Sequence, residues 1–540
     1  MKRGSDNLFI SLLCVLMFCG ELFSIWDKSL TYDEGAHVHY GLNILRGDSS
    51  RFDDSKMPVT ALNAIPTRFA EKMKIHLLGD KTPTILFYHG FSRIPTMIFS
   101  LFVLCVIFKW ARHLYGSWSA RVAGFLFAFS PNIIAHSSLA TNDVYAMGGV
   151  LFSVVSFYHL MRRRSLSKLL LFSLALSFAM ISKFTCVFLY PMFFAMFLLR
   201  YLPVFKKLFR GTSVLPSEVF FKALLKHFAI FAILSLLFIN SAYFFNGSLR
   251  PLKSYNFRSD DFRRIAQNQF FASVPVPLPA PMIEGLDWIN YNQITGKTFG
   301  NVYMLGRTAP RGEGFLLYYF VVWFFKIPLG TQMLFYLALL GWLRSRAGKF
   351  RRILFEKDFI YLLFPAIFFF VLLSVVLKAQ LGVRYLLICM PFIFVFSAGW
   401  AGRNWYFSRR RALILIICLW NIISLLSYWP HFIAYFNELS LDRKNNWRIL
   451  GDSNIDWGQN VKYLKEYAIS NPNMYFNPED EVEGLIVVDV NNLNGVLCSP
   501  ERYRWLRDKH EPIGHIAYSY IIYDTSKSFS GIGNGMGKSK

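Results

Sequence analysis

The chain has 540 residues, of which 54% are hydrophobic and 18% aromatic, and its formal net charge is +25. A mean hydropathy of +0.35 is too high for a soluble enzyme, and the apolar residues gather in runs that approach the roughly 20 residues needed to cross a bilayer. The charge does not indicate nucleic acid binding, because Lys and Arg cluster in short connectors such as MRRRSLSK and SRRR, as the positive-inside rule requires of cytoplasmic loops. We therefore predict a polytopic α-helical membrane protein of the cytoplasmic (inner) cell membrane.

About eleven membrane crossings are expected by the usual length criterion. Residues 168–182 and 184–200 are separated only by Lys183 and are either two crossings or two short half-crossings. Residues 315–343 contain Lys326-Ile327-Pro328, which should break the helix because proline removes a backbone donor and clashes with the preceding turn. The predicted crossings lie near 8–26, 91–109, 119–136, 143–161, 168–182, 184–200, 221–245, 315–343, 358–377, 384–401 and 411–429.

The first apolar run has a basic start but is long, carries Glu21 and lacks a clear cleavage site, so we interpret it as a retained anchor with the N-terminus inside. The transmembrane domain then spans 1–429, with outer loops at 27–90 and 246–314. A small extracytoplasmic α/β domain is predicted at 430–525, followed by a disordered tail at 526–540. Six of the seven cysteines lie in apolar runs, so no disulfide frame and no cysteine zinc site is expected.

The stretch TYDEGAHVHYG (31–41) places two carboxylates and two histidines just after the first apolar run. The helix-like spacing that follows puts Asp33 and Glu34 at a helix N-terminus, where exposed amides favour carboxylates. Asp33 and His37 share one face of such a helix, whereas His39 points away. Because Zn²⁺ usually takes at least three protein ligands, we expect a catalytic carboxylate here and no dedicated zinc site.

Asp143, in SSLATNDVYAMGG, lies where the third and fourth crossings meet the outer face. An ionisable group at a membrane is costly and marks a candidate functional site. The residue also fits a helix start, because Thr141-Asn142-Asp143 immediately precedes an apolar helix. The sequence leaves both interpretations open.

Positive charge at the outer ends of the helices departs from the positive-inside rule and needs a reason. Lys183 in ISKFT, Lys326 in FFKIPLG and Arg384-Tyr385 in AQLGVRYLL hold such positions. Snorkelling to the membrane surface is one reason. A shared phosphate site is another, since Arg offers a planar fork and Lys a point charge to phosphate oxygens. Together with the outer acids, these cations predict a phosphorylated lipid whose head group reacts at the membrane surface.

The segment LGDSNIDWGQNVKYLKEY (450–467) opens the polar C-terminal tail. Asp452, Asn454 and Asp456 alternate as in a calcium loop, but the later Gly and Glu of an EF-hand are out of register. We expect capping and turn roles before a helix at NVKYLKEYA. Further along, EGLIVVDV and HIAYSYIIYD are typical of short strands, and SPERYRWLRD of a short helix.

These motifs resemble the polyprenyl-phosphate-sugar-dependent glycosyltransferases of the GT-C fold. The resemblance is to glycosyltransferase family 39 in its bacterial branch, the protein O-mannosyltransferases, and to their lipid A aminoarabinose transferase relatives. It covers nearly the whole chain and rests on YDEGAHVHYG, ATNDVY, ISKFT, FFKIPL, LGVRYLLICMPF and the run from PHFIAYFNELS to LKEY. Leu387-Ile388 and KMPVTAL depart from prolines that many relatives carry, which leaves the acceptor class open.

The resemblance implies an inverting transfer in which Asp33 acts as catalytic base, with Glu34 its neighbour and Asp143 orienting the acceptor or a cation. Four residues are expected to hold the lipid phosphate of the donor: Lys183, Lys326, Arg384 and Tyr385. The expected partners are a polyprenyl-phosphate-linked sugar, membrane lipid, and a protein, lipid or glycan acceptor. No cofactor is certain, and a divalent cation is left open because metal dependence varies across the fold.

A transporter or lipid-linked sugar flippase is the alternative function. Its charges should lie near the bilayer midplane, often in internal repeats. The charges of this chain lie at outer loop ends, and no repeat is evident. A scaffold whose outer tail binds a partner would leave Asp33, Asp143 and Arg384 without a shared purpose. The residues therefore favour an enzyme.

Overall fold

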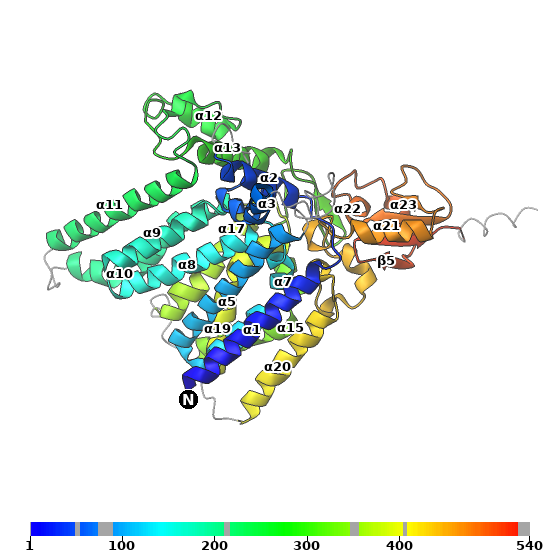
Figure 1. Cartoon of the computed structure of the whole chain (residues 1–540), viewed down its shortest axis with the longest axis horizontal. Coiled ribbons are helices and arrows are strands. Elements are labelled where there is room, and N and C mark those ends of the chain that lie inside the picture. Colours follow the sequence, from blue (N-terminus) through cyan, green and yellow to red (C-terminus); the bar gives the residue numbers. More distant parts are fainter. Residues whose placement is uncertain are drawn as a thin grey trace, which may run out of the picture.

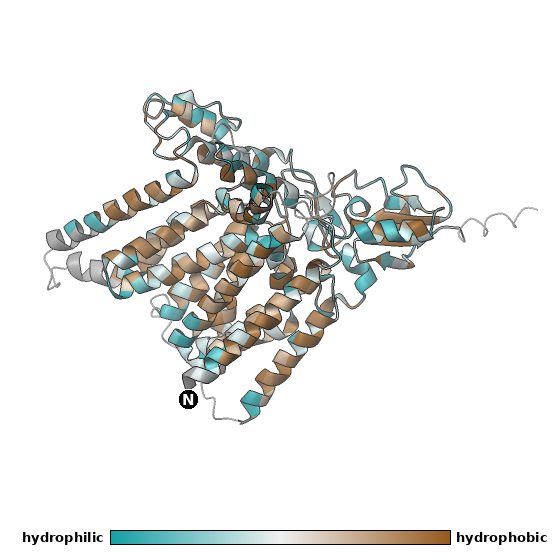
Figure 2. Cartoon of the chain, viewed as in Figure 1, coloured by the Kyte–Doolittle hydropathy of each residue, from teal (hydrophilic) through white to brown (hydrophobic). Residues whose placement is uncertain are grey.

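The computed structural model describes residues 2–48, 55–73, 90–209, 217–345, 356–402 and 408–526. Long helices run side by side in a slanted array (Figure 1) and are apolar over most of their length (Figure 2). The helices are α1 (Lys2–Ile25), α2 (Glu34–Leu45), α3 (Ala61–Met73), α5 (Ile94–Tyr115), α6 (Ser117–Ala128), α7 (Pro131–Ser137), α8 (Asp143–Arg162), α9 (Leu166–Met180), α10 (Leu189–Phe209), α11 (Ser217–Ala242), α12 (Asp260–Gln267), α13 (Ala280–Thr295), α14 (Tyr318–Lys326), α15 (Leu329–Arg344), α17 (Phe364–Val375), α18 (Val383–Leu386), α19 (Met390–Gly402), α20 (Ser408–Leu426), α21 (Val461–Ser470), α22 (Val490–Leu493) and α23 (Arg504–Lys509).

The predicted membrane crossings all fall on helices, but not all of these helices are long. Among the described residues, six helices are long and apolar enough to cross a membrane, or up to seven if one bent pair is a single span. Two further apolar helices, Leu166–Met180 and Phe359–Val375, are shorter. The segment after Lys183 passes as a full span of 19 residues, Phe184–Leu202. It is therefore longer than the half-crossing considered from the sequence.

Two prolines interrupt the array. The bent pair is α14 and α15, which meet at 112°, and the break falls at Ile327-Pro328 as predicted. The prediction of one helix over 119–136 is wrong, because α6 ends at Ala128 and α7 starts at Pro131. Proline is well suited to the first turn of a helix, where its missing N–H has no partner to lose. Ser130-Pro131 therefore begins a second, short helix.

The array has two distinct ends (Figure 1). At one end lie α2, α3, α13 and the C-terminal region, residues 430–526, and we call it the C-terminal face. At the other end lies the N-terminus, and we call it the N-terminal face. The array is held along its length by packing of α8 on α9, of α5 on α6, and of α19 on α6 and α15.

The C-terminal region contains a four-stranded sheet in the order β3-β4-β6-β5. Val488 of β4 and Ile521 of β6 belong to the same core as the helices, whereas Val487 and Ile522 belong to a core with residues of α21. The sheet is thus buried on both sides and continuous with the helical array. The strands are β1 (Val302–Met304) and β2 (Arg307–Ala309), which form a separate hairpin, and β3 (Tyr475–Phe476), β4 (Leu485–Asp489), β5 (Gly514–Ile516) and β6 (Tyr520–Asp524).

The strands expected in EGLIVVDV and HIAYSYIIYD are therefore present, as are the two helices expected beside them. The predicted disordered tail lies outside the described residues, apart from residue 526.

Candidate functional site

Asp33 stands at the start of α2, as the sequence predicts, but its side chain makes no capping hydrogen bond. Its carboxylate instead accepts a hydrogen bond from Nη1 of Arg384 at 3.1 Å and lies 3.9 Å from Nζ of Lys56. The Asp33 side chain is 36% exposed and that of Arg384 11%. The carboxylate is therefore the accessible member of the pair.

The turn before Arg384 depends on a glycine. Gly382 has a φ of 79°, and a Cβ at this position would lie 2.9 Å from Oδ1 of Asn454. From this turn, Arg384 donates through Nε to the Leu381 carbonyl at 3.2 Å. Its Cζ lies 4.1 Å from the ring centroid of Trp457. The guanidinium is thus fixed by a backbone acceptor at one edge and an aromatic ring against its face.

Asp143 and Lys183 form a second ion pair. Asn142 is the N-cap of α8 and makes no side-chain capping bond, while Asp143 accepts a hydrogen bond from Nζ of Lys183 at 2.5 Å. The same Nζ lies 3.8 Å from the ring centroid of Tyr385. Because Tyr385 follows Arg384 directly, the two ion pairs are neighbours, although their residues come from four separate parts of the chain.

One cavity of about 410 Å³ connects the two pairs, and five of the seven predicted site residues line it: Asp33, Asp143, Lys183, Arg384 and Tyr385. Further charged or aromatic residues to which the sequence analysis gave no part in the site also line it, among them His37, Lys56, Asp452 and Trp457. Two of these carried a usable signal. His37 is one helical turn after Asp33. Lys56 is a cation in a predicted outer loop, so it departs from the positive-inside rule in the same way as Lys183.

The charges around the cavity set the ionisation of its residues. Burial raises the pKa of Asp33, but Arg384 and Lys56 outweigh burial and lower that pKa to about 2. Burial, with Lys56, lowers the pKa of His37 to about 3. Burial raises the pKa of the Asp452 carboxyl. At neutral pH the cavity therefore holds an ionised Asp33 next to an uncharged imidazole.

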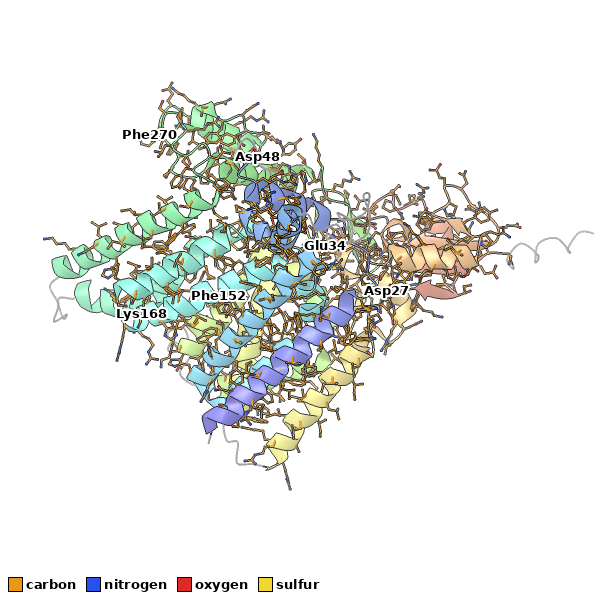
Figure 3. All side chains as sticks on the ribbon, in the orientation of Figure 1. Asp27, Glu34, Asp48, Phe152, Lys168 and Phe270 are labelled. Atoms are coloured by element: carbon orange, nitrogen blue, oxygen red, sulfur yellow. The ribbon has the colours of Figure 1, made fainter. Side chains whose placement is uncertain are left out.

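Glu34 does not line the cavity, although it is adjacent to Asp33 in sequence. Figure 3 shows it where the helices meet the C-terminal region. Its two oxygens accept hydrogen bonds from Nε and Nη2 of Arg93, both at 2.7 Å, and from the backbone amides of Thr31 and Ala140, both at 2.8 Å. The side chains of Glu34 and Arg93 are 0% and 1% exposed. Glu34 thus joins α2 to α5 and has no contact with the cavity.

Lys326 is likewise separate from the cavity. It is fully buried at the end of α14, where Nζ donates to the carbonyl of Ile433 at 2.9 Å and to that of Asn454 at 2.6 Å. These contacts join the helical array to the segment that leads into the C-terminal sheet. An ammonium in this position satisfies backbone acceptors and is not presented to a ligand.

The acids of the cavity do not form a cluster of protein metal ligands among the described residues. Within the described ranges, no three Asp, Glu, His or Cys side chains come close enough to share a metal ion. Asp33 and Asp143 each face a protein cation instead.

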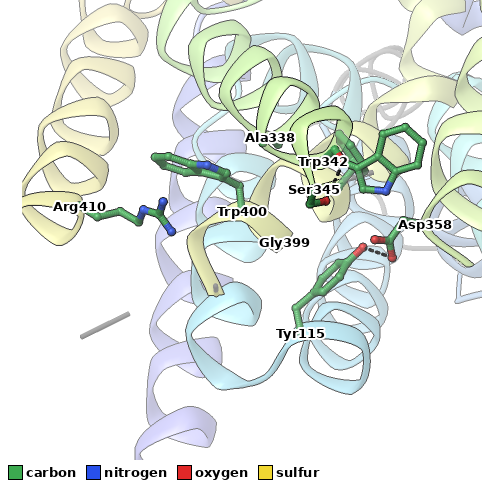
Figure 4. A pocket seen from close by; sticks show the side chains of 10 residues that line it. Tyr115, Ala338, Trp342, Ser345, Asp358, Gly399, Trp400 and Arg410 are labelled. Atoms are coloured by element: carbon green, nitrogen blue, oxygen red, sulfur yellow. Dashed lines mark hydrogen bonds between the residues drawn. The ribbon is translucent and has the colours of Figure 1, made fainter. Parts of the chain in front are cut away.

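A second cavity, of about 180 Å³, lies at the N-terminal face between the ends of α5, α15 and α19 (Figure 4). Tyr115 donates to Asp358 at 2.7 Å, and Arg410 lies 4.5 Å from the ring centroid of Trp400. None of the predicted site residues lines this cavity. The cavity at the C-terminal face is therefore the candidate site.

Comparison with known proteins places this geometry in a fold family. Residues 90–215 match a family model described as dolichyl-phosphate-mannose-protein mannosyltransferase. The oligosaccharyltransferase of Archaeoglobus fulgidus in its apo form matches with a TM-score of 0.51 at 14% identity, over 86% of this chain. The chain has a GT-C fold. It spans 59% of the length of that oligosaccharyltransferase.

A weaker structural match extends over almost the full chain. ArnT from Cupriavidus metallidurans, in a crystal structure with bound undecaprenyl phosphate, aligns over 97% of this chain and 98% of its own length, at 10% identity and a TM-score of 0.47. No curated protein matches the sequence. The family model describes a mannosyltransferase and the structural match is an oligosaccharyltransferase, so the resemblance to GT-C glycosyltransferases inferred from the sequence motifs is confirmed.

Proposed function

We propose that this protein moves a sugar from a polyprenyl-phosphate donor to an acceptor hydroxyl, with inversion of configuration. The observation that carries the proposal is the presence of two acid–cation pairs, Asp33 with Arg384 and Asp143 with Lys183, in one cavity. Transfer of a sugar from a phosphate needs a base for the incoming hydroxyl and positive charge for the leaving group. The cavity contains both.

In the proposed reaction Asp33 accepts the proton of the acceptor hydroxyl, and the hydroxyl oxygen attacks the anomeric carbon from the face opposite the phosphate. The bond between that carbon and the phosphate oxygen breaks, and its electron pair leaves with the polyprenyl phosphate. Lys183 and Arg384 stabilise the additional negative charge on the phosphate. Asp143 holds Lys183 in place and orients the acceptor.

Both cations are already bound to carboxylates before a donor arrives, so the donor phosphate must compete for them. Arg384 keeps the pKa of Asp33 low, which makes Asp33 a weak base while the pair is intact. When a phosphate binds Arg384, its negative charge offsets part of the positive charge that stabilises the Asp33 carboxylate, and the basicity of Asp33 rises. The base is therefore activated by donor binding, which favours a donor-first order.

We propose that the C-terminal face is extracytoplasmic and that the protein lies in the inner membrane. The basic connector MRRRSLSK, residues 161–168, begins in the last turn of α8, at the end opposite Asp143, so it belongs to the N-terminal face. Positive loops remain in the cytoplasm. Polyprenyl-linked donors then reach the cavity from the outer leaflet, while the acceptor is a protein, lipid or glycan hydroxyl.

A transporter is supported less well by this arrangement. Asp33, Asp143 and Lys183 precede the helices that follow them or stand in their first turn, at one end of the array. A translocation path would need such charges near the middle of the helices.

The proposal is tested with the full chain in lipid nanodiscs, supplied with polyprenyl-phosphate donors that carry a labelled sugar and with acceptor extracts. Asp33→Asn should lower turnover by about 100- to 10,000-fold, the usual contribution of a general base. The affinity for undecaprenyl phosphate should be unchanged or higher, because Arg384 is released.

Asp27→Asn is the matched control. Asp27 is in the same loop, and its carboxylate pairs with Lys462 outside the cavity, so turnover should be retained. Full turnover by Asp33→Asn would remove Asp33 as the base. No turnover of any donor by the wild type would overturn the proposed function.

A further inference from the structure

One wall of the cavity comes from the C-terminal region, and this wall contacts Arg384. Trp457 is buried, and the guanidinium carbon lies 4.1 Å from its ring centroid. Nε of Arg384 is bound to Leu381 and Nη1 to Asp33. Within the described part of the chain, Nη2 has no hydrogen-bond partner. A stacked guanidinium still donates from its edge, so Nη2 remains available to a ligand oxygen.

Residues 457–459, which include Trp457, also bind the residues that precede Asp33 in the chain. The amide of Tyr32 donates to the Trp457 carbonyl and the amide of Ser29 to the Gln459 carbonyl, both at 3.0 Å. Gly458 has a φ of 88°, and a Cβ there would lie 3.2 Å from the Tyr32 ring. The chain before the proposed base therefore lies along residues 457–459. A displacement of this segment would move both members of the Asp33–Arg384 pair.

The residues just before this segment, Asn454 and Asp456, are anchored on two sides. Toward the helices, Nδ2 of Asn454 donates to the Tyr318 hydroxyl at 2.9 Å, and Lys326 donates to the Asn454 carbonyl. Toward the sheet, Nδ2 of Asn491 in α22 donates to the Asp456 carbonyl at 3.2 Å. The position of Trp457 is thus fixed jointly by the helical array and by the C-terminal sheet.

We propose that Trp457 is the positioning residue of the donor site. Its indole confines the Arg384 guanidinium to one plane, in which Nη1 reaches Asp33 and Nη2 is presented to an oxygen of the lipid phosphate. The C-terminal region is then part of the active site and not an appended binding domain. This inference rests on the proposed function, because it assigns the ligand of Nη2.

The test compares Trp457→Leu with Trp457→Phe in the full chain in nanodiscs. Leucine keeps apolar bulk but has no ring, whereas phenylalanine keeps a flat aromatic face. Trp457→Leu should raise the Kd for undecaprenyl phosphate and the KM for the donor on the order of tenfold, the effect of losing a partly desolvated cation–π contact. Trp457→Phe should recover most of that loss. A role in packing alone would lower the thermal unfolding midpoint and leave Kd and KM unchanged in both variants.

Trp447→Leu is the matched control. Trp447 is also buried in the C-terminal region and has an arginine 5.0 Å from its ring centroid, Arg448, but it does not line the cavity. This variant should lower the thermal unfolding midpoint and leave Kd and KM unchanged. An active wild type whose Trp457→Leu variant keeps its Kd and KM would overturn the inference alone. A wild type that turns over no donor would overturn the proposed function and the inference together.

Discussion

Replacing Glu34 by glutamine tests whether this carboxylate stabilises the fold or takes part in catalysis. Both Glu34 oxygens accept bonds from N–H groups, one from Arg93 and Ala140, the other from Arg93 and Thr31. A glutamine has one acceptor oxygen, so in either orientation its NH₂ faces two N–H donors. It also leaves the Arg93 cation buried without a countercharge. Breaking a buried ion pair in this way costs about 3–5 kcal/mol, and we expect the free energy of unfolding to fall by that amount.

The assay is thermal unfolding of Glu34→Gln in detergent, with turnover measured per folded molecule. We expect a lower unfolding midpoint and turnover close to wild type in the fraction that stays folded. Asp33→Asn is the contrast, since Asp33 is 36% exposed and its loss should reduce turnover without a comparable loss of stability. If Glu34→Gln unfolds at the wild-type temperature but transfers no sugar, Glu34 is catalytic and the structural interpretation is refuted.

The contacts of Lys326, Arg384 and Asp456 give three further predictions. Lys326→Met leaves the Ile433 and Asn454 carbonyls unpaired and should cost about 1–3 kcal/mol in chemical unfolding; an unchanged free energy of unfolding would contradict this structural role. Arg384→Lys loses the planar fork and should raise the donor KM in turnover assays; an unchanged KM would exclude Arg384 from phosphate binding. Burial and repulsion from Asp489 raise the pKa of Asp456, so its acid form is favoured by folding and stability should fall as pH rises. Unfolding midpoints at about pH 5 and about pH 9 should differ less in Asp456→Asn than in the wild type; an equal difference would contradict this.

The helical part of the fold was predictable because each helix buries a long apolar run, which is visible in the sequence alone. The break at Pro328 was predictable because proline removes a backbone donor and clashes with the preceding turn, and Lys326 places a charge beside it. The break at Pro131 has no such charge, and the apolar residues continue across it. Its one signal was Ser130 before the proline, because serine is a favoured N-cap and proline a favoured first helical residue. Apolar periodicity outweighed that local signal.

The sequence predicted most of the charged residues of the site, but it did not predict which acid pairs with which cation. The cost of placing charge at a membrane identified Asp143, and departure from the positive-inside rule identified Lys183 and Arg384. Asp33 and Arg384 are 351 positions apart in the chain, and no local pattern reports such a contact. Trp457 shows the same limit more clearly. Its sequence neighbours indicated only a turn before a helix, whereas its contact with Arg384 depends on how the C-terminal sheet packs on the helices.

The two adjacent acids show why residue type alone could not complete the assignment. Successive residues at a helix start point about 100° apart, so Asp33 and Glu34 cannot both face one cavity. Helix geometry alone does not say which of them does. The choice is made by the cations that the fold brings to each side, namely Arg93, the N-cap of α5, for Glu34 and Arg384 from α18 for Asp33. Arg93 is enclosed by helices, so its partner became a fixed part of the core. Arg384 borders the cavity, so its partner remains free to exchange with a ligand and is the better candidate for chemistry.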